Sequence, residues 1–168
     1  MAKRVHHYSV TVEWTGNRGL GTPDYAGYGR EHLIHAAGKA PIAGSSDPEF
    51  RGDAARWNPE ELLVGSLSAC HKLWYLHLCS AAGISVVAYR DEAVGTMTED
   101  ADGSGRFASV VLRPVVRIRT GDDTSMAEQL HAAAHRYCFI ANSVAFPVTC
   151  EPRVEVATSA ADAAANGS

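Results

Sequence analysis

The sequence lacks several features that would assign it to particular classes of protein. No apolar run approaches the ~18 residues that a membrane-spanning helix needs, and its start, MAKRVHHYSV, contains no apolar segment typical of a signal peptide. No cluster of lysine and arginine indicates a nucleic-acid-binding face, and the formal net charge is -4. No internal repeat is visible. We therefore expect a cytoplasmic protein that binds neither nucleic acid nor membrane.

Cysteine is also scarce, with four in 168 residues. In a reducing compartment such cysteines are more often free, metal-bound or redox-active than paired in a structural framework. The remaining composition, with 46% apolar and 20% charged residues, is that of an ordinary globular protein. The length suits one domain, which we predict over residues 1–157. We expect the alanine-rich tail, 158–168, to be disordered.

Hydrophobic periodicity and turn signals predict an α+β fold in which helices pack on antiparallel sheet. A glycine-rich turn, TGNRGLGT, follows the first strand, and residues 36–56 read as a long loop with one short strand. The predicted strands cover residues 8–14, 25–34, 84–97, 106–119 and 148–156. The predicted helices cover residues 59–82 and 124–137, with a short helix from residue 141.

The first predicted helix has strong start and stop signals. Asn58 can cap it, Pro59 suits the first helical position, and acidic residues follow in the first turn, where they oppose the helix dipole. Gly83 ends it. Because the helix is apolar on nearly every side, we expect it to be central and buried.

This helix carries two cysteines and two histidines in the run SACHKLWYLHLC. Cys70 and Cys79 are nine residues apart, so at ~100° per residue they point to opposite sides of the helix. His71 and His77 diverge as well. Spacing within the helix therefore gives no metal site.

A second pair of histidines lies in the sequence HAAAH. His131 and His135 could share one face of a helix, but the zinc-protease motif needs a glutamate after its first histidine, and Ala132 stands there. We interpret the pair as part of a partly solvated helix face and predict no metal site in the chain.

A reactive thiol fits the sequence better than a metal. Cysteines in such positions are usually small buried hydrophobes, and we expect this of Cys79 and Cys150. Cys70 follows a run of small residues, GSLSA, which permits close approach of another segment or a ligand. Cys138 lies at the junction of two helical segments, where a side chain can reach across. Neither position alone indicates a function.

Two blocks in combination carry more information. The block NPEELLVGSLSAC, followed by AHRYCFIANSV and preceded by the turn TGNRG, resembles the OsmC/Ohr family of thiol-dependent hydroperoxide reductases over residues 8–156. The resemblance implies an intertwined homodimer with strongly curved sheets around a long central helix. It implies reduction of organic hydroperoxides, and less well of hydrogen peroxide, without a cofactor. Dihydrolipoyl groups of a lipoylated protein, or a small dithiol, restore the enzyme.

The resemblance also assigns roles to residues. Cys70 becomes a sulfenic acid, and Cys138 condenses with it to a disulfide. A free thiol of pKa ~8.5 is mostly protonated at neutral pH, so a cation is needed to favour the attacking thiolate. Arg18 matches the arginine of one branch of the family. In another branch the arginine precedes the helix, where this chain has Arg51 and Arg56.

Glu60 matches the carboxylate that holds this arginine in the family. At ~1.5 Å per residue it lies about 15 Å along the helix axis from Cys70, so the arginine or a partner subunit must span the gap. A first-turn acid in a capped helix needs no such role. Candidates for the substrate pocket are Arg51 and the apolar residues Leu67, Trp74 and Phe139, which suit a core equally well.

Two other classes of function remain open. The same apolar crevice could hold a lipid or another hydrophobic ligand without catalysis. Alternatively, the two cysteines could report oxidation without turnover, as a redox sensor. Consumption of thiols by a hydroperoxide, with repeated turnover under a dithiol, distinguishes the enzyme from both.

Overall fold

The computed structural model of the chain describes residues 4–158. Contacts between residues divide it into two compact units, residues 1–62 and 63–168. All but Thr158 of the predicted tail lies outside the described residues. No helix within residues 4–158 is long and apolar enough to cross a membrane. Within residues 4–158, two α-helices and three three-stranded sheets confirm the α+β class.

The N-terminal unit contains one antiparallel sheet in the order β1–β2–β3. Its strands are β1 (Thr11–Trp14), β2 (His32–His35) and β3 (Ile42–Gly44), with a short 3-10 helix, η1 (Pro48–Phe50), in the loop that follows. The first two strands are shorter than predicted. All four residues of β1 are exposed, so its alternating pattern does not correspond to burial within this chain.

Helix α1 (Pro59–Ala81) begins and ends as predicted. The Asn58 side chain accepts a hydrogen bond from the Glu61 amide at 2.7 Å, and the Glu61 carboxylate accepts one from the Asn58 amide at 3.2 Å. These reciprocal bonds form a capping box. At the other end Gly83 adopts a φ of 75°, and the Ile84 amide donates to the Cys79 carbonyl at 2.9 Å. Such a left-handed glycine terminates many helices.

The exposure of α1 differs from the expectation of a helix buried on all sides. One face, with a residue every four positions, is fully buried: Leu67, His71, Tyr75 and Cys79. Another face at the same spacing is exposed: Gly65, Ala69, Leu73 and His77. Within one chain, α1 is therefore covered on one side only.

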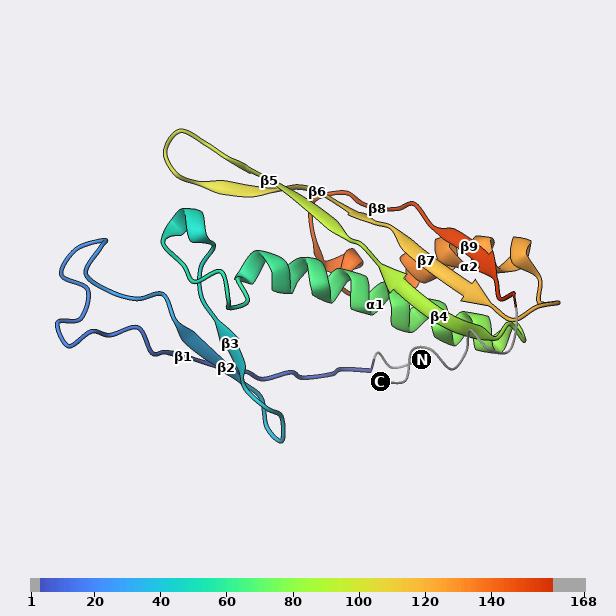
Figure 1. The fold of residues 1–168 in the computed structure, drawn as a ribbon, viewed down its shortest axis with the longest axis horizontal. Helices are drawn as coiled ribbons and strands as arrows, with labels where there is room; N and C mark the ends of the chain where they lie inside the picture. Colours follow the sequence, from blue (N-terminus) through green and yellow to red (C-terminus); the bar gives the residue numbers. More distant parts are fainter. Residues whose placement is uncertain (1–3, 159–168) are drawn as a thin grey trace. The chain divides into compact units, whose positions relative to one another are not determined.

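The C-terminal unit contains six strands, which run from yellow-green through orange to red in Figure 1. One sheet has the order β5–β6–β8 and the other β4–β7–β9. The strands are β4 (Val86–Asp91), β5 (Val94–Glu99), β6 (Gly105–Leu112), β7 (Pro114–Ile118), β8 (Val148–Cys150) and β9 (Arg153–Val156). Each of the three predicted long strands is thus split in two. The last one pairs parallel to β6 and β7, which corrects the purely antiparallel expectation.

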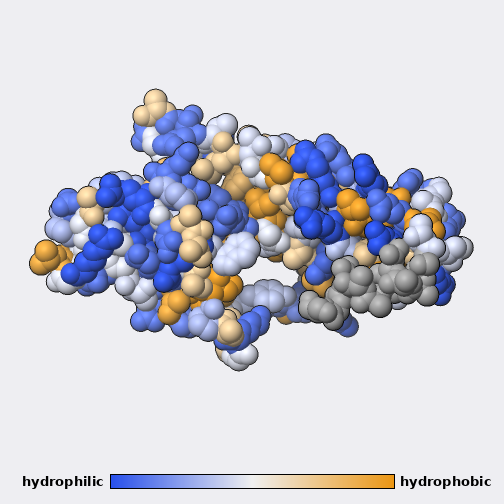
Figure 2. Space-filling view, viewed as in Figure 1, coloured by the Kyte–Doolittle hydropathy of each residue, from blue (hydrophilic) through white to orange (hydrophobic). Residues whose placement is uncertain are grey.

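Two of the three splits lie next to prolines. Pro114 and Pro152 have no N–H to donate to a neighbouring strand. The Arg113 amide instead donates to the Asp91 carboxylate at 2.7 Å. Burial nevertheless continues across the break, because every second residue from position 110 to 118 of the central strand is buried. On the outer surface, Figure 2 shows apolar side chains over β5 and β6 interspersed with hydrophilic ones.

Helix α2 (Thr124–Tyr137) matches its prediction and packs against β9. Asp123 caps it, and the Tyr75 hydroxyl of α1 donates to the Ala127 carbonyl at 3.1 Å. A 3-10 turn, η2 (Ala141–Ser143), follows as predicted. The hydrophobic core has two clusters along α1, one around Leu67 and β6, the other around Tyr75, β7 and α2.

Candidate functional site

Cys70 lies on α1, one residue before the buried face of that helix. Its neighbour His71 is fully buried, whereas Cys70 is partly exposed and its thiol is free. Successive helical residues are rotated by ~100°, so the two side chains leave the helix in different directions. Cys70 is therefore held on a rigid helix with its sulfur at the edge of the core.

Cys138 is the C-cap of α2. Its amide donates to the His135 carbonyl at 3.2 Å, and its backbone is extended, which directs the chain into η2. The side chain is 1% exposed, and its sulfur accepts a hydrogen bond from the Ala141 amide at 3.4 Å. The junction between α2 and η2 thus holds the Cys138 sulfur in a buried position, next to the backbone amide of Ala141.

The structure brings these two cysteines together. The Cys70 and Cys138 side chains are near neighbours, although they are 68 residues apart in the sequence. Burial, and then the interaction with Cys70, raises the pKa of Cys138 to about 11. Cys138 is therefore protonated at neutral pH. A pair of free thiols in contact can exchange two electrons by forming a disulfide.

Aromatic side chains lie on the surface next to this helix junction. The Trp74 ring stacks on Tyr137, with centroids 5.1 Å apart, and meets Phe139 edge-on at 5.7 Å. Phe139 is 67% exposed, and Trp74 borders a shallow cavity of about 250 Å³ with Leu73 and His77. Leu67, the third apolar pocket candidate, is fully buried and belongs to the core.

The candidate arginines and Glu60 lie in the N-terminal unit. Arg18 is exposed on the glycine-rich turn, where the Asn17 side chain accepts hydrogen bonds from the Gly19 and Gly21 amides. Arg51 has a φ of 65° after η1. Glu60 is partly buried in the first turn of α1.

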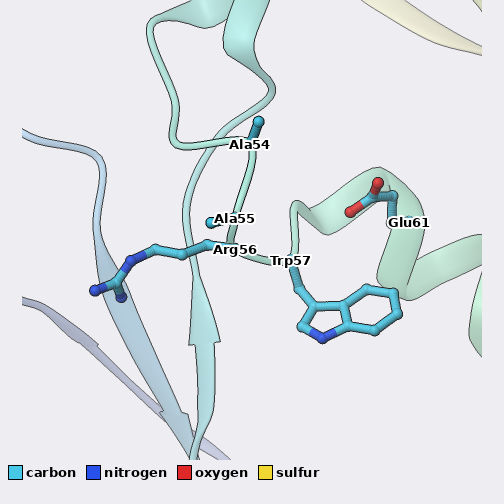
Figure 3. A pocket seen from close by; sticks show the side chains of 5 residues that line it. All are labelled: Ala54, Ala55, Arg56, Trp57 and Glu61. Atoms are coloured by element: carbon cyan, nitrogen blue, oxygen red, sulfur yellow. The ribbon is translucent and has the colours of Figure 1, made fainter.

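Arg56 forms an ion pair with Asp53 at 3.5 Å. It also borders a cavity of about 330 Å³ with Trp57, Glu61 and two alanines. Figure 3 shows its guanidinium pointing away from the other lining side chains. Arg56 therefore already has a carboxylate partner of its own.

Sequence reasoning missed a polar cluster in the C-terminal unit. His71 of α1, His131 of α2 and Cys150 of β8 meet below the protein surface. The His71 Nε2 and His131 Nδ1 atoms are 3.0 Å apart, and the Cys150 sulfur lies 3.6 Å and 4.0 Å from them, respectively. Pairs on a single helix gave no sign of it. The three residues come from three elements, and only the fold brings them together.

Two expectations change with this cluster. His131 is 3% exposed, so it does not lie on a solvated helix face, whereas Cys79 is fully buried as expected. Cys150 is not merely a buried apolar residue, because its sulfur contacts two imidazoles.

The ionisation of the cluster follows from its burial. Burial lowers the pKa of His71 to about 4, although the Asp91 charge opposes this. Burial, and then the charge of His71, lowers the pKa of His131 to about 3. Burial, and then the Asp91 charge, raises the pKa of Cys150 to about 12. At neutral pH all three side chains are uncharged.

The fold is α+β, and its candidate site combines a thiol on helix α1 with a nearby thiol at the end of helix α2. Residues 52–153 match the family model described as OsmC-like protein. Because that match covers more than half of the chain, the protein belongs to the OsmC-like family.

Relatives of known structure agree in fold. An OsmC-like protein of unknown function from Vibrio cholerae is 31% identical, with a TM-score of 0.78 over 88% of this chain and 99% of that one. The organic hydroperoxide resistance protein OsmC from Legionella pneumophila has a TM-score of 0.66 at 19% identity, over 92% and 100% of the two chains. In sequence, an uncharacterized protein of Bacillus subtilis, YmaD, is 22% identical over 83% of this chain and 87% of its own length.

Proposed function

We propose that this protein is a cysteine-based peroxidase that reduces organic hydroperoxides, and less well hydrogen peroxide. The observation that carries the proposal is the proximity of the Cys70 and Cys138 side chains, one partly exposed on α1 and the other buried at the end of α2. One sulfur is partly accessible and the other is buried, which is the asymmetry expected of an attacking and a resolving thiol. The family, whose structural neighbours include organic hydroperoxide resistance proteins, supports the same chemistry.

The reaction balances over two thiols and one peroxide. The Cys70 thiolate attacks the O–O bond and becomes a sulfenic acid, while the alcohol leaves with one peroxide oxygen and a proton. The Cys138 sulfur then attacks the Cys70 sulfur, forming the disulfide and releasing water. A dithiol reduces this disulfide by exchange and becomes a disulfide itself. The peroxide gains two electrons, and the dithiol supplies them.

The two cysteines differ in a way that supports separate roles. Cys138 is buried, and with a pKa of about 11 its thiol keeps its proton at neutral pH. Cys70 is partly exposed, so it is the sulfur that a peroxide can reach. A sulfenic acid formed on Cys70 would lie near Cys138, which suits condensation to a disulfide.

A cation should favour the attacking thiolate, and we assign this role to Arg18 first and Arg51 second, with Glu60 as the carboxylate that orients it. Arg56 ranks last because Asp53 already neutralises it. The exposed rings of Trp74 and Phe139 suit the organic part of a bulky peroxide. We place the enzyme in the cytoplasm, where dihydrolipoyl groups or small dithiols can reduce it.

We further propose an intertwined homodimer with curved sheets around α1. Among described residues 4–62, the buried ones are glycines, Ser45 and Asn58, so this unit has no apolar core of its own. Val10 and Val12 are exposed by 64% and 62%, and Leu73 of α1 by 62%. Apolar surface of this extent is normally covered. A second copy of the chain, presenting the same surfaces, can cover them reciprocally.

The decisive experiment compares peroxide turnover by the wild type, Cys70→Ser and Cys138→Ser. Cys70→Ser should abolish consumption of cumene hydroperoxide. Cys138→Ser should consume one equivalent and stop at a sulfenic acid that dimedone traps. Cys79→Ser, which removes a buried thiol of the same helix, is the matched control and should keep turnover.

Other results would favour the alternative functions. Oxidation of the wild type without turnover under a dithiol would favour a redox sensor. Full retention of all four thiols under peroxide would favour a module that binds hydrophobic ligands. Mapping a disulfide between Cys70 and Cys79 would contradict the two-cysteine mechanism.

A further inference from the structure

The proposed peroxidase mechanism does not use the cluster of His71, His131 and Cys150. Its three side chains belong to α1, α2 and β8, so it joins both helices to the sheet. Along α1, His71 lies between Leu67 and Tyr75, which belong to the two separate core clusters. A polar group at this position interrupts an otherwise continuous apolar core.

The distances within the cluster resemble those between the ligands of one metal ion. With metal–nitrogen bonds of ~2.0–2.1 Å and a metal–sulfur bond of ~2.3 Å, tetrahedral to trigonal angles place the nitrogens about 3.3–3.6 Å apart and the sulfur about 3.5–3.8 Å from each. The observed separations are 3.0 Å between the nitrogens and 3.6 Å and 4.0 Å from the sulfur. Shifts of about half an ångström would therefore bring the three atoms onto one ion.

The two imidazoles each direct one ring nitrogen toward the Cys150 sulfur. These atoms are His71 Nε2 and His131 Nδ1. The outer ring nitrogens, His71 Nδ1 and His131 Nε2, are buried without a hydrogen-bond partner among the described residues. The inner nitrogens share a hydrogen bond of 3.0 Å, so in the metal-free protein one of them carries a proton. Metal binding would move that proton to the outer nitrogen of the same ring, which leaves both inner lone pairs facing the ion.

The surroundings favour a cation over an anion. The Asp91 charge acts on both His71 and Cys150. This carboxylate accepts hydrogen bonds from the Ser68 hydroxyl at 2.5 Å and the Arg113 amide at 2.7 Å, so it is held in place. The Tyr75 ring stacks on His131, with centroids 3.8 Å apart, and shields the imidazole from water. Two neutral imidazoles and one thiolate would neutralise a monovalent ion, and Asp91 would offset the second charge of a divalent one.

We propose that His71, His131 and Cys150 form a buried metal site for a thiophilic closed-shell ion, Zn(II) or Cu(I). Thiolate and imidazole ligands suit both ions. Binding replaces the proton of the Cys150 thiol, so one proton is released for each ion bound. The ion would link α1, α2 and β8, which gives the site a structural effect independent of Cys70 and Cys138.

The test begins with reduced, metal-free full-length protein under anaerobic conditions. Co(II) is the spectroscopic probe, because a thiolate ligand gives an intense near-ultraviolet charge-transfer band. We expect one equivalent of Co(II) per chain with this band and its displacement by Zn(II). In a parallel arm, Cu(I) is offered in competition with a chromophoric chelator. Stoichiometric binding of either ion, with a rise in melting temperature, supports the site and identifies its preferred metal.

Two variants separate this site from the proposed peroxidase thiols. Cys150→Ser removes the thiolate ligand, so the charge-transfer band should disappear. Its affinity for the metal ion should fall at least tenfold. The double variant Cys70→Ser/Cys138→Ser should keep one equivalent and the full band. If Cys150→Ser does not fold, X-ray absorption on the zinc-loaded wild type decides, since one sulfur and two nitrogens are expected around the ion.

Three results would overturn the proposal. The first is failure of both Zn(II) and Cu(I) to bind the wild type with a dissociation constant below about 10 µM. The second is loss of binding in the Cys70→Ser/Cys138→Ser variant with retention in Cys150→Ser. The third is a zinc environment without sulfur.

Discussion

The raised pKa of Cys138 predicts how its alkylation depends on pH. With a pKa of about 11, about one Cys138 thiol in a thousand is ionised at pH 8. At the same pH, about one thiol in four is ionised for an ordinary cysteine of pKa ~8.5. Because the thiolate is the reactive form, ionisation alone should slow its alkylation about 200-fold. Its 1% exposure should slow it further.

The assay is pulsed labelling of the reduced native protein with iodoacetamide, followed by peptide mass mapping. Cys70, which is partly exposed, should be labelled first. From pH 8 to 10 the rate at Cys138 should rise about tenfold per pH unit, whereas an ordinary thiol levels off near pH 8.5. Urea-denatured protein, in which all four cysteines should react alike, provides the control.

The same shift has a consequence for stability. Because folding raises the pKa of Cys138, the protonated thiol favours the folded state. This contribution to the free energy of unfolding is complete below pH ~8.5 and is lost as the pH rises through about 11. In Cys70→Ser, labelling of Cys138 should stay slow, because burial is the larger cause of the shift. A rate at Cys138 that levels off near pH 8.5, or equals that of Cys70 at pH 8, would refute the reasoning.

Two further predictions concern stability and assembly. Asn58→Ala removes the acceptor of the Glu61 amide and should lower the free energy of unfolding by about 1 kcal/mol in a urea titration; no change would mean that water replaces the cap. In light scattering the wild type should have about twice the chain mass of 17.9 kDa. Leu73→Asp should shift that mass toward one chain, because a charge would enter an apolar interface. A wild type that is already monomeric at micromolar concentration would refute the dimer.

The helices could be predicted almost completely from the sequence. Asn58 and Gly83 are local signals that act on the backbone beside them, and the structure places the ends of α1 where they indicate. Two strand breaks had a local signal, Pro114 and Pro152, which the predicted long strands ran through. The break at Arg113 also involves a distant group, because the Asp91 carboxylate, 22 positions earlier, accepts the Arg113 amide hydrogen bond.

The candidate site, too, could be predicted from the sequence only in part. Cys70 and Cys138 were predicted from two blocks of sequence, and the fold brings their side chains close together. No local sequence pattern indicated the cluster at His71, because His131 and Cys150 lie 60 and 79 positions further along the chain. Burial of one α1 face was likewise invisible in a helix that is apolar nearly all round, since only the neighbouring strands select the face that they cover.

The parallel pairing of β8 and β9 has a consequence for how the C-terminal unit folds. The hairpin of β5 and β6 closes a short loop, whereas Val110 pairs with Val148 and Val115 with Arg153, each 38 positions further along the chain. Pairings of greater sequence separation cost more loop-closure entropy and form later. A chain that ends before Val148 would leave one edge of both β6 and β7 unpaired, and such open edges promote aggregation.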